Sequence, residues 1–466
     1  MLVANLLRDD GQSLSSSTQK KLLSLACSLS HGCFENIKIM VEQGAVGALV
    51  NILLDTTVKK IYPLAEICCT TIRNLSEENM SVKAFESTNV IKEIITSLQL
   101  WGAVSQVGAN TNFSFEKLVW GSLANLTTSS KLRTQLCANI SLLQLIASNL
   151  QQCIPEGGAP LAVDCCRTLG ALATDEVNRG RLAKFQIPSL TVALLETYWE
   201  NSESIAEYAA AAIGDMSLHE INRMQLLSSH ACPILIRSLS QHMASGEASR
   251  NSCWALASVA GSVNEDIFDT SNIANEKTRK IPYASSPLAS SSSSSGSTGG
   301  GRGAAAGSSG ASGFGFGVDL QDFLATRGAC EALVGVLRTH AHDVHRGAVG
   351  YAAFTAVVHL ALNHRQNQLK FGALGACEIL MELLSLRIEE AKEARAQSQH
   401  GAEAEAGKGV LLFLRALACL TGNCIETRVR AGATGVCTVL ASAMSFFFND
   451  GTIAAAACLA VGSLVR

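Results

Sequence analysis

The sequence predicts an all-α fold, a solenoid of about eight repeats that each contain three helices. Three observations support this prediction. A helix-end pattern recurs along the chain, and a helix-start pattern follows it at a nearly constant distance. Strand patterns, meaning alternating β-branched residues joined by tight Asn-Gly turns, are absent. One unit, such as Ile205 to Leu239, cannot bury its own apolar faces, so each repeat needs a neighbour on both sides.

The first pattern marks the end of the third helix of each repeat, as in Ile72-Arg73-Asn74-Leu75-Ser76. We call its central position the anchor. The positions two before and one after the anchor are apolar, and residues three apart share a helix face, so they predict a core stripe. The anchors are Ser28, Asn74, Asn125, Ala171, Asp215, Ser258, His359, Cys419 and Ser463.

The second pattern, as in Gly44-Ala45-Val46, opens the next apolar helix 14 to 16 residues after the anchor in seven of eight cases. The exception is the distance of 70 residues from Ser258 to Gly328. The extra segment is rich in Ser, Gly and Ala and has little to bury, which predicts disorder. The sequence therefore divides into N-terminal repeats (1–263), a disordered insertion (264–318) and C-terminal repeats (319–466).

A second, smaller excess falls at residues 389–408, which are charged and alanine-rich. We predict a solvated helical extension that ends in a loop. Four asparagines, Asn36, Asn178, Asn222 and Asn367, lie eight residues before a helix-start pattern. This spacing predicts that each of them is the N-cap of the short first helix of its repeat.

The composition narrows the functional class. The net charge of −3 offers no basic stripe for nucleic acid. The sixteen cysteines lie in apolar runs and never form a CxxC pair, which predicts buried, reduced thiols in a cytosolic protein. The start has no signal-peptide pattern, and the most apolar segment is interrupted at Asn449, Asp450 and Gly451, so we expect no membrane insertion. The expected compartment is the cytoplasm, with the nucleus left open.

No motif for catalysis is found. The glycines at 299–303 are not followed by the Lys-Ser/Thr helix start of a phosphate-binding loop. His340, His342 and His345 have no Cys or Glu at a spacing that would fix a metal ion. We therefore expect no enzymatic activity, no cofactor and no metal site.

Two stretches resemble known repeats. Gly44 to Leu54 resembles the second helix of an armadillo repeat, and Cys253 to Ala260 resembles the third. The resemblance covers nearly the whole chain apart from the two insertions, with degenerate repeats. HEAT repeats, which have two helices, are the alternative. An armadillo fold implies a right-handed superhelix whose third helices line a concave groove that binds extended peptides or other proteins.

Armadillo proteins that import nuclear cargo carry Trp and Asn four residues apart on the third helix. Here Asn is found only at two anchors and Trp only at one position, and no acidic row is present, so a receptor for nuclear localisation signals is not expected. An alternative role for the two anchor asparagines is to join neighbouring repeats, and for the Trp to fill the core. The resemblance implies these groove residues: Arg73, Asn74, Asn125, Arg167, Asp215, Trp254, Ser258, His359 and Arg415.

The predicted function is a scaffold or adaptor that binds proteins or extended peptides. Two alternatives remain open. The chain could be the recognition module of a longer enzyme, a ubiquitin ligase or a kinase, or it could be an exchange factor or chaperone for small GTPases. Neither end carries a helix with a polar outer face, which favours a segment of a longer protein.

Overall fold

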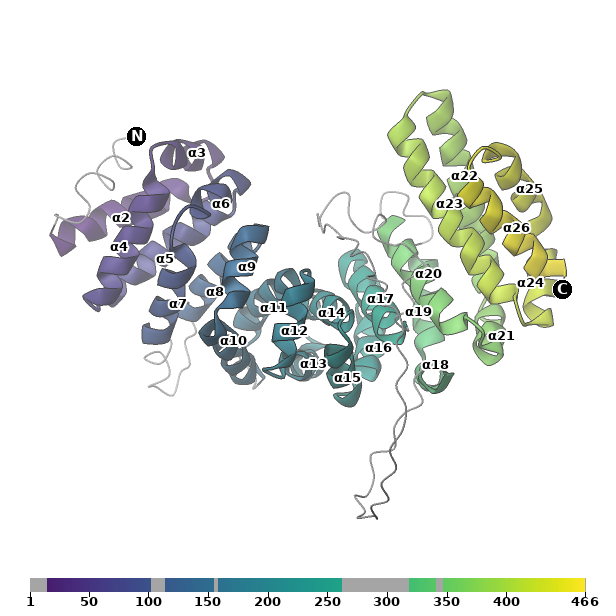
Figure 1. Cartoon of the computed structure of the whole chain (residues 1–466), viewed down its shortest axis with the longest axis horizontal. Coiled ribbons are helices and arrows are strands. Elements are labelled where there is room, and N and C mark those ends of the chain that lie inside the picture. The colour runs from purple at the N-terminus through teal and green to yellow at the C-terminus, as the bar shows by residue number, and fades with distance from the viewer. Residues whose placement is uncertain (1–14, 102–113, 155–157, 262–317, 341–346, 466) are drawn as a thin grey trace, which may run out of the picture.

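The computed structural model describes residues 15–101, 114–154, 158–261, 318–340 and 347–465. Over these ranges the secondary structure is entirely helical (Figure 1). The helix α2 (Ser16–Ser30) comes first, and eight sets of three helices follow it. The predicted all-α solenoid of about eight three-helix repeats is confirmed.

The three helices of each set differ in length and position. The short first helices are α3 (Phe34–Glu42), α6 (Asn79–Phe85), α9 (Ser130–Ala138), α12 (Glu176–Ala183), α15 (Glu220–Ser228), α18 (Val318–Thr326), α21 (Arg365–Ala373) and α24 (Ile425–Ala433). The second helices are α4 (Ala45–Val58), α7 (Val90–Trp101), α10 (Ile140–Cys153), α13 (Ile187–Tyr198), α16 (Ala231–Gln241), α19 (Ala329–Thr339), α22 (Ala376–Ala396) and α25 (Val436–Phe446). The third helices are α5 (Tyr62–Ser76), α8 (Ser114–Leu126), α11 (Ala159–Ala173), α14 (Glu203–Ser217), α17 (Gly246–Ala260), α20 (Gly347–Ala361), α23 (His400–Thr421) and α26 (Gly451–Val465).

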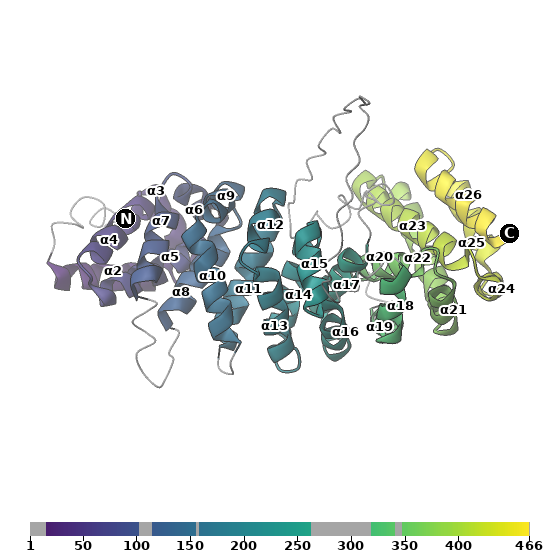
Figure 2. The ribbon, with the colours of Figure 1, turned by 60° about the horizontal axis from the view of Figure 1, so that its bottom comes forward.

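The repeats stack side by side into an elongated molecule with the two chain ends at opposite ends (Figures 1 and 2). Each third helix packs against the third helix of the next repeat, from α2 through to α26. We call this series of helices the third-helix row. The row continues across the long insertion, because α17 packs directly on α20. The two predicted blocks of repeats, 1–263 and 319–466, therefore form one continuous stack.

The helix-start pattern marks a sharp turn. Every second helix begins at the middle residue of this pattern, and the preceding residue is in the left-handed region at Gly44 (φ 80°), Gly328 (φ 92°), Gly375 (φ 85°) and Gly435 (φ 79°). Glycine adopts this conformation without steric cost. The turn sets the first helix at a steep angle to the second, 79° between α3 and α4.

The predicted core stripe is buried in the seven inner third helices. Ile72 and Leu75 on α5, for example, have no exposed surface. The pattern differs at the two ends of the row, where Leu29 of α2 and Val461 of α26 are exposed by more than a third. The same positions are core only where a neighbouring repeat covers them.

The predicted N-cap role of the four asparagines is wrong. Asn36, Asn178, Asn222 and Asn367 are each the third residue of a first helix and lie inside it. Three of their side-chain amides donate hydrogen bonds to backbone carbonyls instead: Asn36 to Leu29, Asn367 to Leu360 and Asn222 to Arg179. Leu29 and Leu360 lie in the last turn of α2 and α20, where carbonyls have no partner within the helix, so Asn36 and Asn367 join consecutive helices. Asn222 instead joins α15 to α12, the first helix of the preceding repeat.

The two insertions have different outcomes. The predicted disordered insertion 264–318 lies outside the described residues, except that Val318 begins α18. The helical extension predicted within 389–408 is present, because α22 continues to Ala396, but the loop that follows it has only three residues before α23 begins at His400. Alanines of both helices, including Ala391 and Ala406, are buried. These small side chains let the two extended helices pack closely, which the charged composition concealed.

All sixteen cysteines lie in the described residues, and none forms a disulfide bond. Eleven of them are buried, including Cys69 and Cys253. Burial raises the pKa of the Cys69 thiol to about 12, so the unreactive protonated form dominates. The eleven buried thiols act as small apolar core residues, as predicted, whereas Cys437 and Cys458 are exposed, contrary to the prediction.

No single helix in the described ranges has the length and apolar character needed to cross a membrane, although two bent helix pairs, α3 with α4 and α24 with α25, pass the same test by length and composition.

Candidate protein-binding surface along the third helices

The third-helix row buries most of its residues and leaves one narrow stripe partly exposed. On α5 this stripe contains Glu66, Ile67, Thr70 and Arg73, which recur at helical spacing. On the other third helices the equivalent positions include Arg167, Tyr208, Trp254 and Arg415, all of which are partly exposed. The stripe is the face of the row that a partner could reach.

The two anchor asparagines join neighbouring repeats. Asn74 is 7% exposed, and its Nδ2 donates to the carbonyl of Cys27 and to Ser30 Oγ, both at 3.2 Å. Asn125 Nδ2 donates in the same way to Ser76 Oγ at 3.2 Å and to the carbonyl of Arg73 at 3.4 Å. Of the two roles that the sequence left open, the structure shows the joining one for both amide groups.

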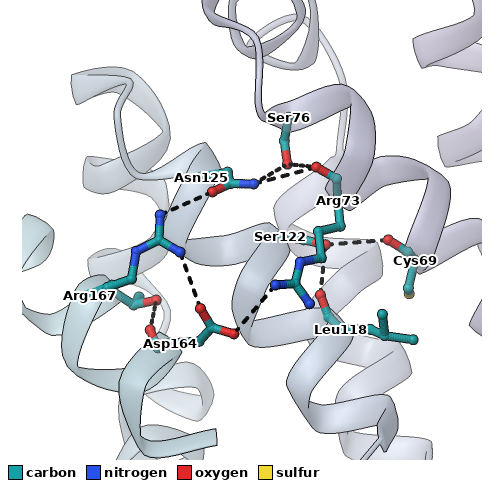
Figure 3. A network of polar contacts seen from close by, with 9 residues as sticks. Cys69, Arg73, Ser76, Leu118, Ser122, Asn125, Asp164 and Arg167 are labelled. Atoms are coloured by element: carbon teal, nitrogen blue, oxygen red, sulfur yellow. Dashed lines mark hydrogen bonds and ion pairs between the residues drawn. The ribbon is translucent and has the colours of Figure 1, made fainter. Parts of the chain in front are cut away.

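A polar network surrounds Asn125 and connects α5, α8 and α11 (Figure 3). Arg167 Nη2 donates to Asn125 Oδ1 at 3.3 Å, and Arg167 Nη1 donates to Asp164 Oδ1 at 3.2 Å. Arg73 reaches the other oxygen of Asp164, with Nη2 and Oδ2 4.0 Å apart. The Arg167 guanidinium also lies over the ring of Tyr208 on α14, 5.8 Å from its centroid. Side chains of four consecutive repeats are thus linked.

Glycines give these long side chains room to lie flat on the next helix. A Cβ atom at Gly121 would lie 2.7 Å from Arg73 Nε, so Arg73 occupies the space above α8. A Cβ atom at Gly214 would lie 2.6 Å from Trp254 Cδ1, so the indole rests on α14 in the same way. Trp254 therefore fills the contact between two repeats while one part of it stays exposed.

The remaining predicted residues differ in accessibility. Asp215 is 3% exposed, which corrects the expectation that it faces a groove. Ser258 is partly buried, and so is His359, whose ring contacts the chain at Gly261. Burial lowers the pKa of His359. Arg415 lies on the partly exposed stripe of α23.

The charge of the stripe changes along the row. The segment from α5 to α11 carries Arg73, Lys117 and Arg167 beside Glu66, whereas the next two helices carry Glu207 and Glu247 beside Arg250. Burial, and then the nearby Glu247 carboxylate, raise the pKa of Glu207. The two segments therefore offer different electrostatic environments to a partner that crosses them.

Two residues of this surface were missed by the sequence analysis. Asp164 and Tyr208 each lie seven residues before an anchor, whereas the armadillo resemblance points to the anchors and to the positions four before them. The spacing of Asp164 and Arg167, three apart on one helix, could have indicated the ion pair.

Within the described ranges, no group of three or more His, Cys, Asp and Glu side chains could hold a metal ion. His342 and His345 lie outside these ranges, and His340 Nε2 lies 2.9 Å from the carbonyl of Met243.

No family model and no curated protein matches the sequence. Solved structures do match. A chain from "A conserved phosphorylation switch controls the interaction between cadherin and beta-catenin in vitro and in vivo" has a TM-score of 0.66 at 14% identity, over 99% of this chain and 78% of that one. An engineered protein matches over 100% of both chains, with a TM-score of 0.60 and 13% identity. A designed armadillo repeat protein covers 55% of this chain at 17% identity and a TM-score of 0.45.

At 14% and 13% identity, the first two matches show similarity of the fold alone. The fold is that of a helical-repeat protein. Its repeats have three helices each, with a steep turn before the second helix and a continuous row of third helices. This is the armadillo-type solenoid that the sequence predicted, and the two-helix HEAT alternative is wrong.

Proposed function

We propose that this protein is a non-catalytic scaffold or adaptor that binds partner proteins or extended peptides along the third-helix row. The observation that carries the proposal is the partly exposed stripe on an uninterrupted series of helices, with Arg167, Trp254 and Arg415 on it. A long cation in the middle of an apolar helix is explained by its exposure on a surface that a partner contacts. A solenoid of the same fold comes from work on the interaction between cadherin and beta-catenin, which supports a protein partner.

The charge-reversed pair Arg167→Glu and Arg415→Glu tests this proposal. Affinity purification of the wild-type protein from cells, followed by mass spectrometry, defines its set of partners. We expect the variant to keep its helical content, measured by circular dichroism, and to lose most of these partners, because like charges would replace the attractive contacts.

A matched control carries the same change of charge away from the row. Lys38 on α3 and Arg237 on α16 are both exposed, and neither belongs to a third helix. The pair Lys38→Glu and Arg237→Glu should keep the wild-type partners. An unchanged set of partners for the third-helix variant would contradict the proposal.

We also propose that the protein is located in the cytoplasm. Imaging of the tagged protein tests this location, and an exclusively nuclear signal would contradict it.

A further inference from the structure

Two arginines from different repeats converge on one carboxylate in the network of Figure 3. Arg73 comes from α5, whereas Asp164 and Arg167 come from α11, with α8 between them. Asp164 is only 7% exposed in its side chain, whereas those of Arg73 and Arg167 are 29% and 36% exposed. The carboxylate therefore lies beneath, and parts of both arginine side chains remain at the surface.

The hydrogen-bonding capacity of this pair is mostly unused. A guanidinium has five N–H donors. Arg167 uses two of its nitrogens, on Asp164 and Asn125. Within the described part of the chain, Arg73 has one ion pair, at 4.0 Å from Asp164, and no hydrogen bond. Several donors from two repeats are thus available to a group that approaches from solvent.

The Arg167 guanidinium is held in place before any partner binds, and Arg73 lies near it over α8. Arg73 lies in the space above Gly121, where a Cβ atom would be 2.7 Å from its Nε. Arg167 is fixed by Asn125 on one side, by Asp164 below and by the ring of Tyr208 at 5.8 Å. Groups that are already ordered lose less conformational entropy on binding, which favours affinity.

The charge of the cluster selects the ligand. Two guanidinium cations and one carboxylate leave a net charge of +1, which matches a monoanion. A phosphate group, with a charge of about −1.5 to −2, would be repelled more strongly by the nearby Asp164 carboxylate than a monoanion is, and would leave the site with a net negative charge. One net positive charge is also far from the basic stripe that nucleic acid requires. Paired planar donors suit the two oxygens of a carboxylate.

We propose that Arg73 and Arg167 together bind the side-chain carboxylate of an Asp or Glu residue in an extended partner segment that crosses α5, α8 and α11. This inference rests on the proposed function, since it names the chemistry of the partner at one part of the row. Asp164 is a positioning residue, which holds the two guanidinium groups at a distance that one carboxylate can bridge.

Selection from a library of random twelve-residue peptides displayed on phage tests the proposal on the full chain. We expect peptides selected by the wild-type protein to contain Asp or Glu at one fixed position. The variant Arg73→Glu with Arg167→Glu should select Lys or Arg at that position, because the charge of the site is reversed. The control pair Lys38→Glu with Arg237→Glu should select the same peptides as the wild type. If charge reversal beside Asp164 lowers the helical content, Arg73→Gln with Arg167→Gln replaces it, and the acidic preference should vanish.

Affinity measurements on the best selected peptide sharpen the test. In the wild type, replacing its acidic residue by the neutral amide should weaken binding about tenfold or more, as expected for loss of a charged hydrogen bond. The same replacement should have little effect in the double Gln variant. Gly121→Ala should weaken the acidic peptide without any change of charge, because the new methyl group displaces Arg73.

The possible failures are distinguishable. Selected peptides without a fixed acidic position, or with affinity that ignores Arg73 and Arg167, would overturn this proposal and leave the scaffold function standing. A phosphoserine peptide that binds tenfold more tightly than the Glu peptide would overturn the choice of a carboxylate. Failure of the wild-type protein to select any peptide would overturn this proposal together with peptide binding along the row.

Discussion

Two interfaces within the third-helix row are built in opposite ways. Between α5, α8 and α11 the contacts at the surface are polar, with Asn125, Arg73, Asp164 and Arg167 linked by hydrogen bonds and ion pairs. Between α20 and α23 the contacts are aromatic. Phe413 packs edge-on against Phe354 at 5.0 Å between ring centroids, and against Tyr351 at 5.9 Å.

The difference suggests that one interface only holds repeats together, whereas the other can also contact a partner. The aromatic interface is closed, because Phe354 and Phe413 are almost fully buried and offer nothing to a ligand. The polar interface leaves the side chains of Arg73 and Arg167 partly exposed. The buried rings of the aromatic interface thus serve stability, and the partly exposed arginines of the polar interface are those that we propose for recognition.

Phe413→Ala should have the largest effect on stability. Removing a buried aromatic side chain costs about 3–5 kcal/mol of unfolding free energy, because a cavity remains. All four tryptophans lie in the N-terminal repeats (1–263), so tryptophan fluorescence reports on those repeats alone. In urea unfolding, we expect the circular-dichroism transition to shift strongly and the fluorescence transition to shift less, because a solenoid repeat contacts only its neighbours.

Phe448 provides the control for this prediction, since it also lies in the C-terminal repeats and is 70% exposed. Phe448→Ala should leave the free energy of unfolding within about 0.5 kcal/mol of the wild-type value. Equal shifts of both spectroscopic transitions in Phe413→Ala would show that the N-terminal and C-terminal repeats unfold as one unit. The stability of the aromatic interface could then not be separated from that of the polar interface.

Substitution of two glycines compares a charged contact with an aromatic contact between third helices. Gly214→Ala drives a methyl group against the indole of Trp254, a rigid side chain packed on α14, and should cost about 1–3 kcal/mol. Gly121→Ala meets only the flexible end of Arg73, which can swing away, so its stability should match that of the wild type. Thermal unfolding of both variants measures the difference. A large loss in Gly121→Ala would mean that Arg73 is held as firmly as a core side chain.

The repeat pattern made the fold predictable from sequence. The anchors and helix starts recur because each third helix must bury the same stripe against its neighbours, and glycine marks the left-handed turn at Gly44, Gly328, Gly375 and Gly435. The helical extension in 389–408 was predicted to be solvated because of its charges, whereas alanines such as Ala391 pack one helix against the other. Local composition does not reveal which face of a helix another helix covers.

The surface was less predictable, because it depends on contacts between residues about 40 to 90 positions apart. Nothing in the local sequence of Asp164 shows that Arg73 approaches it from two repeats away. Asp215 illustrates the reverse error, since its place at an anchor suggested exposure and the structure buries it. Family resemblance located the row, and only the packing shows which of its side chains reach solvent.

Asn74→Ala tests the joining role of the polar interface. The variant loses the hydrogen bonds to the carbonyl of Cys27 and to Ser30 Oγ, and leaves buried acceptors without that donor. We expect a loss of about 1 kcal/mol in unfolding free energy, measured by urea unfolding with tryptophan fluorescence. Arg73 and Arg167 are not touched, so affinity for an acidic peptide should stay the same. A selective loss of peptide affinity at unchanged stability would instead assign Asn74 to recognition.

His359 should give the smallest effect, and only in acid. Burial lowers its pKa in the folded state, so the unfolded chain, with a pKa of about 6.5, takes up a proton first as the pH falls. The contribution of His359 to folding stability is therefore fully present above this pKa. It declines as the pH drops below that value, until His359 is protonated in the folded state too. His359→Gln removes this term, so the difference in unfolding free energy between pH 7.5 and pH 5 should be smaller in the variant than in the wild type. An identical difference in both proteins would mean that His359 is protonated equally well in the folded and unfolded states, and that the C-terminal interface is open to solvent at this point of the row.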